Sequence, residues 1–350
     1  MIDLSKFAEE IQKLEKALNE AKTILLTAPG VADGDSIGAQ LALRRMLKHS
    51  YPKTEVRIVN DEPLQDRYLF LPDIQYVETP ETFWASNPVS NFDLGIIVDG
   101  GVDRAGRVRE IYEKCNKTAF IDHHIVSVQF SYDIRIVEPT ACSTTELVYH
   151  LSQLPAFSTP LSKEFCQQVY LGLIFDTGFF RHSSTTPEAM ELGAKLLRTG
   201  FDFTRVGERG MLERTFNSLK LLSYTLARAQ LRAEGKIIWS TVTQDTLRSF
   251  KATDDDREGI IDHLFLTHGI EVAVLFYEMP ESKTRLSFRS QGAIDVARFA
   301  RSLTEHGGGH EKASGAMLDI PMSEAVEWVL ERLEAAFESG QFNASKKKKR

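Results

Sequence analysis

Cysteine and long apolar runs are both scarce in this sequence. The three cysteines among its 350 residues, Cys115, Cys142 and Cys166, are odd in number and unevenly spaced, which argues against a disulfide framework and a thiolate zinc site. No apolar stretch approaches the about 20 residues of a membrane-spanning helix. The charged, amphipathic N-terminal segment also lacks a signal-peptide core. We therefore expect a cytoplasmic protein without a membrane anchor.

The chain also has no surplus of positive charge. The net charge is −7 although the last five residues, KKKKR, are all basic, so the body of the chain is more acidic still. Such a body is a poor platform for long duplex nucleic acid, which requires many cationic phosphate contacts. A short nucleotide held by a few arginines and metal ions remains compatible with it. We interpret the end of the chain as a disordered, solvated tail, and a role for its lysines toward RNA stays open.

Apolar material, by contrast, is sufficient for large cores, since 42% of residues are hydrophobic and 26% are charged. In the first part of the chain, short β-branched runs alternate with helical patterns; these runs are TILLTA, TEVRIVN, DLGIIVD and TAFIDHH. Runs that are apolar on both faces and separated by helices are typical of a buried parallel sheet built from βαβ units. We therefore predict an α/β fold with a parallel sheet.

The pattern changes in the last third of the chain. Strands are expected at KIIWSTVT, EVAVLFYEM, TRLSFRS and ASGAMLDI, with three helices between and after them. This arrangement predicts a smaller α+β domain with its own sheet. We divide the chain into a parallel-sheet domain at 1–201, an amphipathic helical linker at 202–232, an α+β domain at 233–338 and the tail at 339–350.

Carboxylates end three of the four N-terminal strands. The acids are Asp33 and Asp35 in VADGD, Asp99 in IIVDG, and Asp122 in FIDHH, where His123 and His124 follow directly. One aspartate at a strand end is usually a turn residue. In an open parallel sheet, however, ligands bind beyond the carboxyl ends of the strands, so these residues would converge on one crevice. Asp176, within an apolar helix, would be costly to desolvate unless it were paired or bound a cation.

Mixed carboxylate and imidazole ligands indicate a particular class of metal site. Without thiolates, they suit manganese, magnesium or iron better than structural zinc. Two such ions close together clamp an attacking water and a phosphoryl group. One histidine would then face a metal and the other the substrate, while Asp122 would orient an imidazole.

These motifs resemble those of a known family. VADGDSIGA, IIVDGG, FIDHH and GLIFDTGFFR, followed by GGGHEKASGA, are similar to the motifs of the DHH phosphoesterase superfamily across about residues 20–320. The chain is most similar to its two-domain nano-RNase (oligoribonuclease) and pAp-phosphatase group, which carries a DHH-associated C-terminal domain. The resemblance implies hydrolysis of short RNA or DNA oligomers, of 3′-phosphoadenosine 5′-phosphate (pAp), or of both, by metal-activated water. Manganese, or else magnesium, would occupy a two-metal site.

The resemblance also implies roles for individual residues. One ion would be ligated by Asp35, Asp99, His123 and Asp176, and the other by Asp33 and a bridging Asp99. His124 would contact the scissile phosphate, with Asp122 beside it in the catalytic machinery. The C-terminal domain would close over the site and bind one end of the substrate through Arg289, Ser290, Gly308, Gly309 and His310. Glycine amides and an arginine fork both suit a phosphate.

One position departs from the family pattern. The first motif usually reads His-x-x-x-Asp-x-Asp, but Pro29 holds the place of the histidine, and residues 1–48 contain no histidine at all. The ion at Asp33 therefore lacks a nitrogen ligand, and we expect that it is weakly held.

Several alternatives stay open. A cyclic- or linear-dinucleotide phosphodiesterase would use the same chemistry, whereas a non-catalytic nucleotide- or RNA-binding regulator would belong to another class. The presence of every other ligand favours an enzyme. The acidic body, without an added nucleic-acid-binding domain, disfavours a RecJ-type exonuclease. Arg104 and Arg107 near Asp99, and Arg181 and His182 near Asp176, are further polar residues outside the core set. A homodimer is neither required nor excluded.

Overall fold

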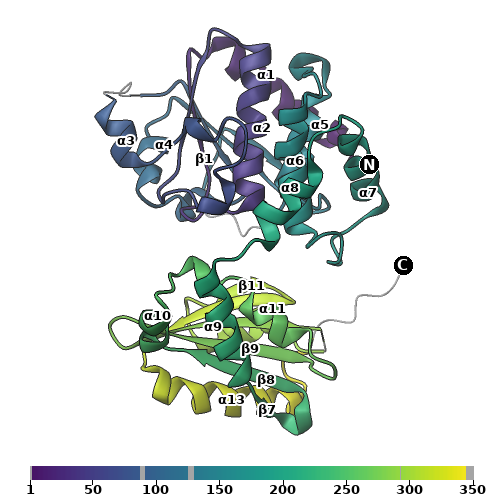
Figure 1. Cartoon of the computed structure of the whole chain (residues 1–350). Helices are drawn as coiled ribbons and strands as arrows, with labels where there is room; N and C mark the ends of the chain where they lie inside the picture. Colours follow the sequence, from purple (N-terminus) through teal and green to yellow (C-terminus); the bar gives the residue numbers. More distant parts are fainter. Residues whose placement is uncertain (1, 87–90, 125–129, 292, 344–350) are drawn as a thin grey trace. The chain divides into compact units, whose positions relative to one another are not determined.

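The computed structural model describes residues 2–86, 91–124, 130–291 and 293–343. The chain divides into two compact units, Met1–Glu213 and Arg214–Arg350, each with its own sheet (Figure 1). Among the described residues, no helix is both long and apolar enough to cross a membrane. The basic run at 346–350 lies outside the described residues, so the disordered tail stays a prediction there. Residues 339–343, which we also expected in the tail, are ordered instead, since Ser339 ends the last helix and Asn343 forms a bridge with Ile294.

A six-stranded parallel sheet forms the centre of the first unit, in the order β3-β2-β1-β4-β5-β6. Its strands are β1 (Thr23–Thr27), β2 (Glu55–Val59), β3 (Val77–Glu78), β4 (Leu94–Val98), β5 (Lys117–Asp122) and β6 (Ile134–Val137). The predicted parallel α/β fold is thus confirmed, and the four predicted strands are β1, β2, β4 and β5. The two edge strands were not predicted because they are only two and four residues long.

Helices cover both faces of this sheet (Figure 1). They are α1 (Ala8–Glu20), α2 (Gly34–Ser50), α3 (Pro80–Ala85), α4 (Arg109–Tyr112), α5 (Thr144–Ser152), α6 (Lys163–Asp176), α7 (Pro187–Leu197) and α8 (Phe203–Gly207). Adjacent strand residues point to opposite faces. Leu26 and Ile96 therefore join the core under α1, α2, α5 and α6, whereas Leu25 and Ile97 join a second core with residues of α3 and α4. Double-sided burial explains the uninterrupted apolar runs.

The strand order positions the site. After β1 the chain moves outward to β2 and β3, and then returns to place β4 on the other side of β1. An open α/β sheet binds its ligands at such a reversal, beyond the carboxyl ends of the strands. The segments after β1 and β4 carry Asp33, Asp35 and Asp99, and β5 ends at Asp122, directly before the two histidines.

The second unit is a mixed six-stranded sheet in the order β11-β12-β10-β9-β8-β7, with β8 and β9 parallel and the other pairs antiparallel. Its strands are β7 (Gln230–Arg232), β8 (Ile237–Val242), β9 (Val272–Met279), β10 (Lys283–Ser290), β11 (Gly308–His310) and β12 (Ala313–Leu318). Its helices are α9 (Phe216–Ala227), α10 (Gln244–Phe250), α11 (Ile260–Phe265), α12 (Val296–Leu303) and α13 (Met322–Ser339). The predicted α+β architecture is confirmed.

The stretch 202–232 is not one continuous helix. It contains α8, a π-helical turn at Glu208–Leu212, α9 and β7. Glu213 is extended, and Thr215 begins α9 by accepting a hydrogen bond from the Ser218 amide. The last residues are a strand because they pair with β8. The amphipathic pattern was therefore correct for α9, but it did not reveal the break before it.

Candidate metal centre

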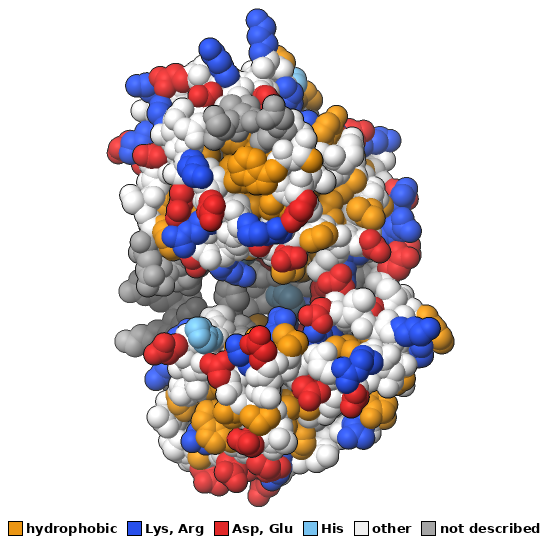
Figure 2. Space-filling view, turned by 90° about the vertical axis from the view of Figure 1, so that its left-hand side faces the viewer, with side chains coloured by type: hydrophobic (Ala, Val, Ile, Leu, Met, Phe, Trp, Pro, Cys, Tyr) orange, Lys and Arg blue, Asp and Glu red, His pale blue; other side chains and the backbone are white. Residues whose placement is uncertain are grey.

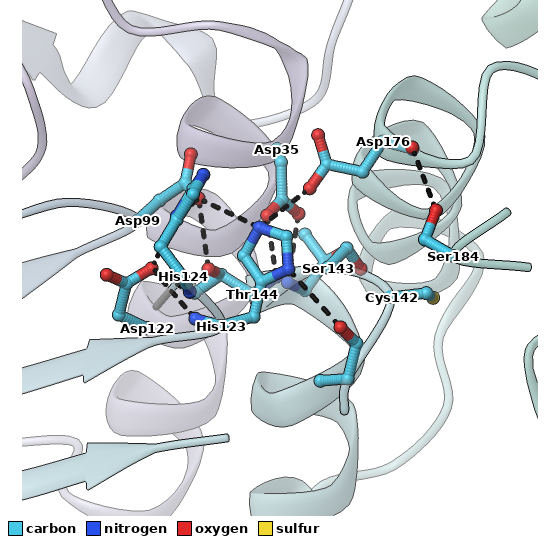
Figure 3. Close-up of polar contacts among 12 residues, drawn as sticks. Asp35, Asp99, Asp122, His123, His124, Cys142, Ser143, Thr144, Asp176 and Ser184 are labelled. Atoms are coloured by element: carbon cyan, nitrogen blue, oxygen red, sulfur yellow. Dashed lines mark hydrogen bonds and ion pairs between the residues drawn. The ribbon is translucent and has the colours of Figure 1, made fainter. Parts of the chain in front are cut away.

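Four predicted ligands lie together in the first unit (Figure 3). Asp35, Asp99, His123 and Asp176 each offer one ligand atom, and these atoms all lie within 4.8 Å of one another. They come from the first turn of α2, the segment after β4, the segment after β5, and the last residue of α6. Four stretches that are distant in sequence therefore converge at the carboxyl edge of the sheet.

A second, overlapping group consists of Asp99, Asp122, His123 and His124, with the same mutual spacing. Asp99 and His123 belong to both groups. Asp33 belongs to neither, and its Oδ1 accepts hydrogen bonds from the amides of Asp35 and Ser36, both at 3.0 Å. This oxygen is therefore engaged as the N-cap of α2.

The buried carboxylate of Asp35 is held by the start of another helix. Its Oδ2 accepts from the Thr144 amide at 2.6 Å, and its Oδ1 from the Thr145 amide at 3.0 Å. The first amides of a helix have no partner within the helix and favour negative charge. The sequence indicated that Ser143 begins α5, which the structure confirms, but not that the amides of this helix would hold Asp35.

Asp99 has a backbone conformation that few residues adopt, with φ of +61°. Its Oδ2 accepts from the Ser36 hydroxyl at 2.5 Å, and its Oδ1 from the Thr144 hydroxyl at 3.1 Å. Burial raises the pKa of Asp99 well above its usual value, and the nearby charges of Asp35 and Asp33 raise it further. The aspartates of the centre thus carry more negative charge than the neighbouring side chains neutralise.

The two adjacent histidines are oriented by different groups (Figure 3). Oδ1 of Asp122 accepts from Nδ1 of His124 at 2.8 Å and from the amides of both histidines. Asp122 therefore lies where an imidazole-orienting residue was expected. Nδ1 of His123 contacts the carbonyl of Ala141 at 3.3 Å. Because a carbonyl only accepts, Nδ1 is the donor, and Nε2 faces the carboxylates.

Two buried atoms indicate that a cation would fit this centre. Nε2 of His123 and Oδ2 of Asp176 lie 3.0 Å apart, yet neither makes a hydrogen bond of good geometry. Two unsatisfied atoms that face each other in a buried site are costly unless a proton or a cation lies between them. Oxygen and imidazole donors without a thiolate suit such a cation when it is a hard divalent ion. The residues present therefore fit a divalent metal.

Protons compete with a cation for this site. Burial raises the pKa of Asp176 to about 7, the charge of Asp35 adds to this, and His123 opposes it. Burial lowers the pKa of His123, but the facing Asp176 carboxylate outweighs burial and raises it to about 9. Ionisation of Asp176 in the folded protein therefore lowers the free energy of unfolding, and this loss grows as the pH rises toward 7. The stability that protonated His123 contributes is lost as pH rises through 9.

Manganese should therefore stabilise the protein more at about pH 8 than at about pH 6, because fewer protons must be displaced at the higher pH. Thermal melts at both pH values, with and without manganese, measure this difference. In Asp176→Asn, the manganese-induced rise in Tm should shrink at both pH values. An equal rise at the two pH values in the wild type would contradict the proton competition.

A strained turn follows Asp176. Gly178, Phe179 and Phe180 all have positive φ, between 54° and 61°, which is unfavourable for bulky residues. The Phe179 ring lies against Gly207 and the Phe180 ring against Gly193, so packing holds the turn in place. The side chains of Arg181 and His182 brace the same turn through backbone carbonyls, at 2.7 Å and 2.9 Å.

The predicted substrate-binding residues belong to the second unit. Nε of Arg289 donates to Asp262 at 2.9 Å, and the buried Ser290 hydroxyl donates to the Ile294 carbonyl at 2.8 Å. Gly308, Gly309 and His310 form β11. A side chain on Gly309 would meet β12 backbone atoms at 2.7 Å, whereas the space at Gly308 is open. The role of these residues toward a substrate stays a prediction.

Comparisons with known proteins agree with this geometry. Residues 23–173 match the DHH family, N-terminal domain, and residues 234–339 match the DHHA1 domain. The chain is 27% identical to the bifunctional oligoribonuclease and PAP phosphatase NrnA of Thermus thermophilus, over 85% of each chain. It is 26% identical to the Bacillus subtilis protein of the same name, over 87% of this chain and 92% of that one.

Solved structures share the fold. An exopolyphosphatase-related protein from Bacteroides fragilis superposes with a TM-score of 0.85 at 24% identity, covering 95% of this chain and 98% of that one. RecJ from Thermus thermophilus, in complex with Mn²⁺, gives a TM-score of 0.58 at 17% identity, covering 98% of this chain and 56% of that one. The two domain matches, together with the acid and histidine cluster in the first domain, lead to one conclusion: the chain belongs to the DHH family, with a DHHA1 domain after its DHH domain.

Proposed function

We propose that the protein is a metal-dependent phosphoesterase that hydrolyses short oligonucleotides, pAp, or both. The observation that carries this proposal is the convergence of Asp35, Asp99, His123 and Asp176 within 4.8 Å at the carboxyl edge of the parallel sheet. Relatives named oligoribonuclease and PAP phosphatase, aligned over most of both chains, support the choice of substrates.

The proposed ion is manganese, or magnesium in its place, since both accept oxygen and imidazole ligands. A bound divalent ion acidifies water and stabilises charge on phosphoryl oxygens. The chain's own residues do the positioning. The amides of α5 hold Asp35, and the carbonyl of Ala141 aims His123.

His124 is the proposed contact to the scissile phosphate. Because Asp122 accepts from its Nδ1, the ring is fixed in orientation, and in its doubly protonated form it has a second N–H to donate. Its other nitrogen, Nε2, then donates to a phosphate oxygen. Asp122 thus acts through His124 as a positioning residue and does not touch the substrate itself.

The second proposed ion position involves Asp33 and a bridging Asp99. With Pro29 at the place of the usual histidine, and with one Asp33 oxygen engaged as a helix cap, few ligands remain there. We propose that this position binds its ion weakly. Arg289, Ser290, Gly308, Gly309 and His310 are the proposed contacts to the end of the substrate.

A hydrolysis panel in the presence of manganese tests this proposal. It should contain pAp, di- to pentanucleotides, cyclic dinucleotides and a long single strand. We expect turnover of pAp or of the shortest oligomers, with rates that fall as the oligomer lengthens.

Each other outcome favours a different function. Fastest cleavage of a cyclic dinucleotide would indicate a cyclic-dinucleotide phosphodiesterase. Equal or faster cleavage of the long strand would indicate a RecJ-type exonuclease. Nucleotide binding without any turnover would indicate a regulator.

A further inference from the structure

We propose that Arg104 binds a phosphate group of the substrate beside the metal centre. This inference rests on the proposed function and assigns a substrate-recognition residue within the first unit. It separates Arg104 from Arg107, which the sequence alone could not distinguish.

The backbone of Arg104 is tied to the segments that carry the acids. Its carbonyl accepts from the Gly30 amide at 2.7 Å, and its amide donates to the Gly101 carbonyl at 3.0 Å. Gly30 lies just before the first acid motif, and Gly101 lies two residues after Asp99. The short helical turn Val102–Arg104 is therefore fixed against both loops.

The side chain of Arg104 lies beside the segment that follows Asp99. Its Nη1 lies 3.8 Å from the position that a Cβ on Gly100 would occupy, and Gly100 directly follows Asp99. Arg104 is exposed to solvent. The guanidinium thus lies beside the residue that follows Asp99 and is open to a ligand that approaches from solution.

The donors of this guanidinium are available. Across the part of the chain that the structure describes, it makes no hydrogen bond and has no carboxylate within the 4.0 Å of an ion pair. Arg107, three residues later, is fully engaged: Nε donates to Asp61 at 2.5 Å, Nη2 donates to the Asp61 carbonyl at 2.8 Å, and Nη1 contacts Glu81. Acidic and basic side chains are interspersed over the face that Figure 2 shows, whereas the Arg104 guanidinium pairs with no described carboxylate.

The positive charge of Arg104 would offset the repulsion between the acid cluster and a phosphate. A cluster of buried aspartates repels a phosphate, and a guanidinium beside it offers a planar fork that matches phosphate oxygens. Pro29 approaches the same Gly100 position, with its Cγ at 2.6 Å. Arg104 therefore supplies a permanent positive charge next to Gly100, the same position that Pro29 approaches in place of the usual histidine ligand.

Three variants test this inference: Arg104→Ala, Arg104→Lys and, as a matched control, Arg107→Ala. Hydrogen bonds to charged groups contribute about 1.5–3 kcal/mol, so Arg104→Ala should raise KM for pAp and dinucleotides about 10- to 100-fold, with a much smaller change in kcat. Arg104→Lys should fall between Arg104→Ala and the wild type, because it keeps the charge but loses the fork. Arg107→Ala should keep the wild-type KM.

Calorimetric binding of pAp in calcium provides a readout that does not depend on turnover. Binding about tenfold weaker in Arg104→Ala, with Arg107→Ala unchanged, supports the inference even if the wild type hydrolyses nothing in the panel; in that case only the proposed function fails. Wild-type KM and wild-type binding in Arg104→Ala would overturn the inference and leave the proposed function standing. An equal loss in Arg104→Ala and Arg107→Ala would also overturn it, since that result indicates a structural effect of the whole segment.

Discussion

Asp99→Asn should abolish hydrolysis while leaving the protein folded. Asp99 and His123 belong to both groups of potential ligands, and Asp99 is also the proposed bridge between the two ion positions, so its loss should disturb both positions. Asparagine keeps the shape of the side chain and, like aspartate, tolerates the left-handed backbone at φ of +61°. Alanine would add backbone strain to the loss of the ligand. The activity should fall by more than the about 10- to 100-fold that supporting residues of a metal site commonly contribute.

Three measurements separate a lost ligand from a lost fold. Turnover of pAp and dinucleotides should vanish, calorimetric manganese binding should weaken, and the metal-free Tm should not fall. The Tm expectation follows from burial, which raises the pKa of Asp99 and makes its charge unfavourable in the metal-free fold.

Asp103→Asn is the matched control. Asp103 is an exposed aspartate in the same loop, and its variant should behave like the wild type. A folded Asp99→Asn protein with wild-type turnover would show that catalysis takes place elsewhere.

The location of the centre was predictable from the sequence for a simple physical reason. Strands buried on both faces of a parallel sheet read as apolar runs, and their carboxyl ends share one edge. Acids that follow three such runs must therefore lie near one another, and Asp35 and Asp99 do. Asp176 was recognisable because an unpaired acid is out of place in an apolar helix.

The groups that hold these acids could not be predicted in the same way. Thr144 donates to both Asp35 and Asp99, yet it lies 109 and 45 positions away in the sequence. No local pattern encodes a contact that depends on how α5 approaches α2. The hydroxyl of Ser36 is a similar case, since in the sequence it reads as an ordinary residue of a helix start.

Short or context-dependent elements were missed for a related reason. A strand such as β3 has two residues, which carry no periodic signal, and it forms because β2 offers it a partner edge. The break before α9 depends on one extended residue and one capping threonine, within a stretch whose amphipathic pattern continues across it.

Manganese titration should reveal two unequal sites, the second at least about tenfold weaker than the first. The strong site has a carboxylate and imidazole set from Asp35, Asp99, His123 and Asp176. At the weak site, one Asp33 oxygen already caps α2, and no imidazole is supplied from residues 1–48. Losing even a supporting residue of a metal site commonly costs about 10- to 100-fold in affinity. Activity should therefore keep rising at manganese concentrations that already saturate the first site.

Pro29→His should restore the missing nitrogen donor and lower the manganese concentration needed for half-maximal rate. The Pro29 ring approaches Gly100, beside Asp99, so an imidazole at this position starts close to the proposed bridging carboxylate. Pro29→Ala is the control, because it removes the ring without adding a ligand and should not improve manganese use. Proline fixes φ near −65°, so both variants also loosen this loop, and only histidine can offset that loss by ligation. Two equally tight manganese sites in the wild type would refute the prediction, because another residue would then have to supply the ligand that Pro29 lacks.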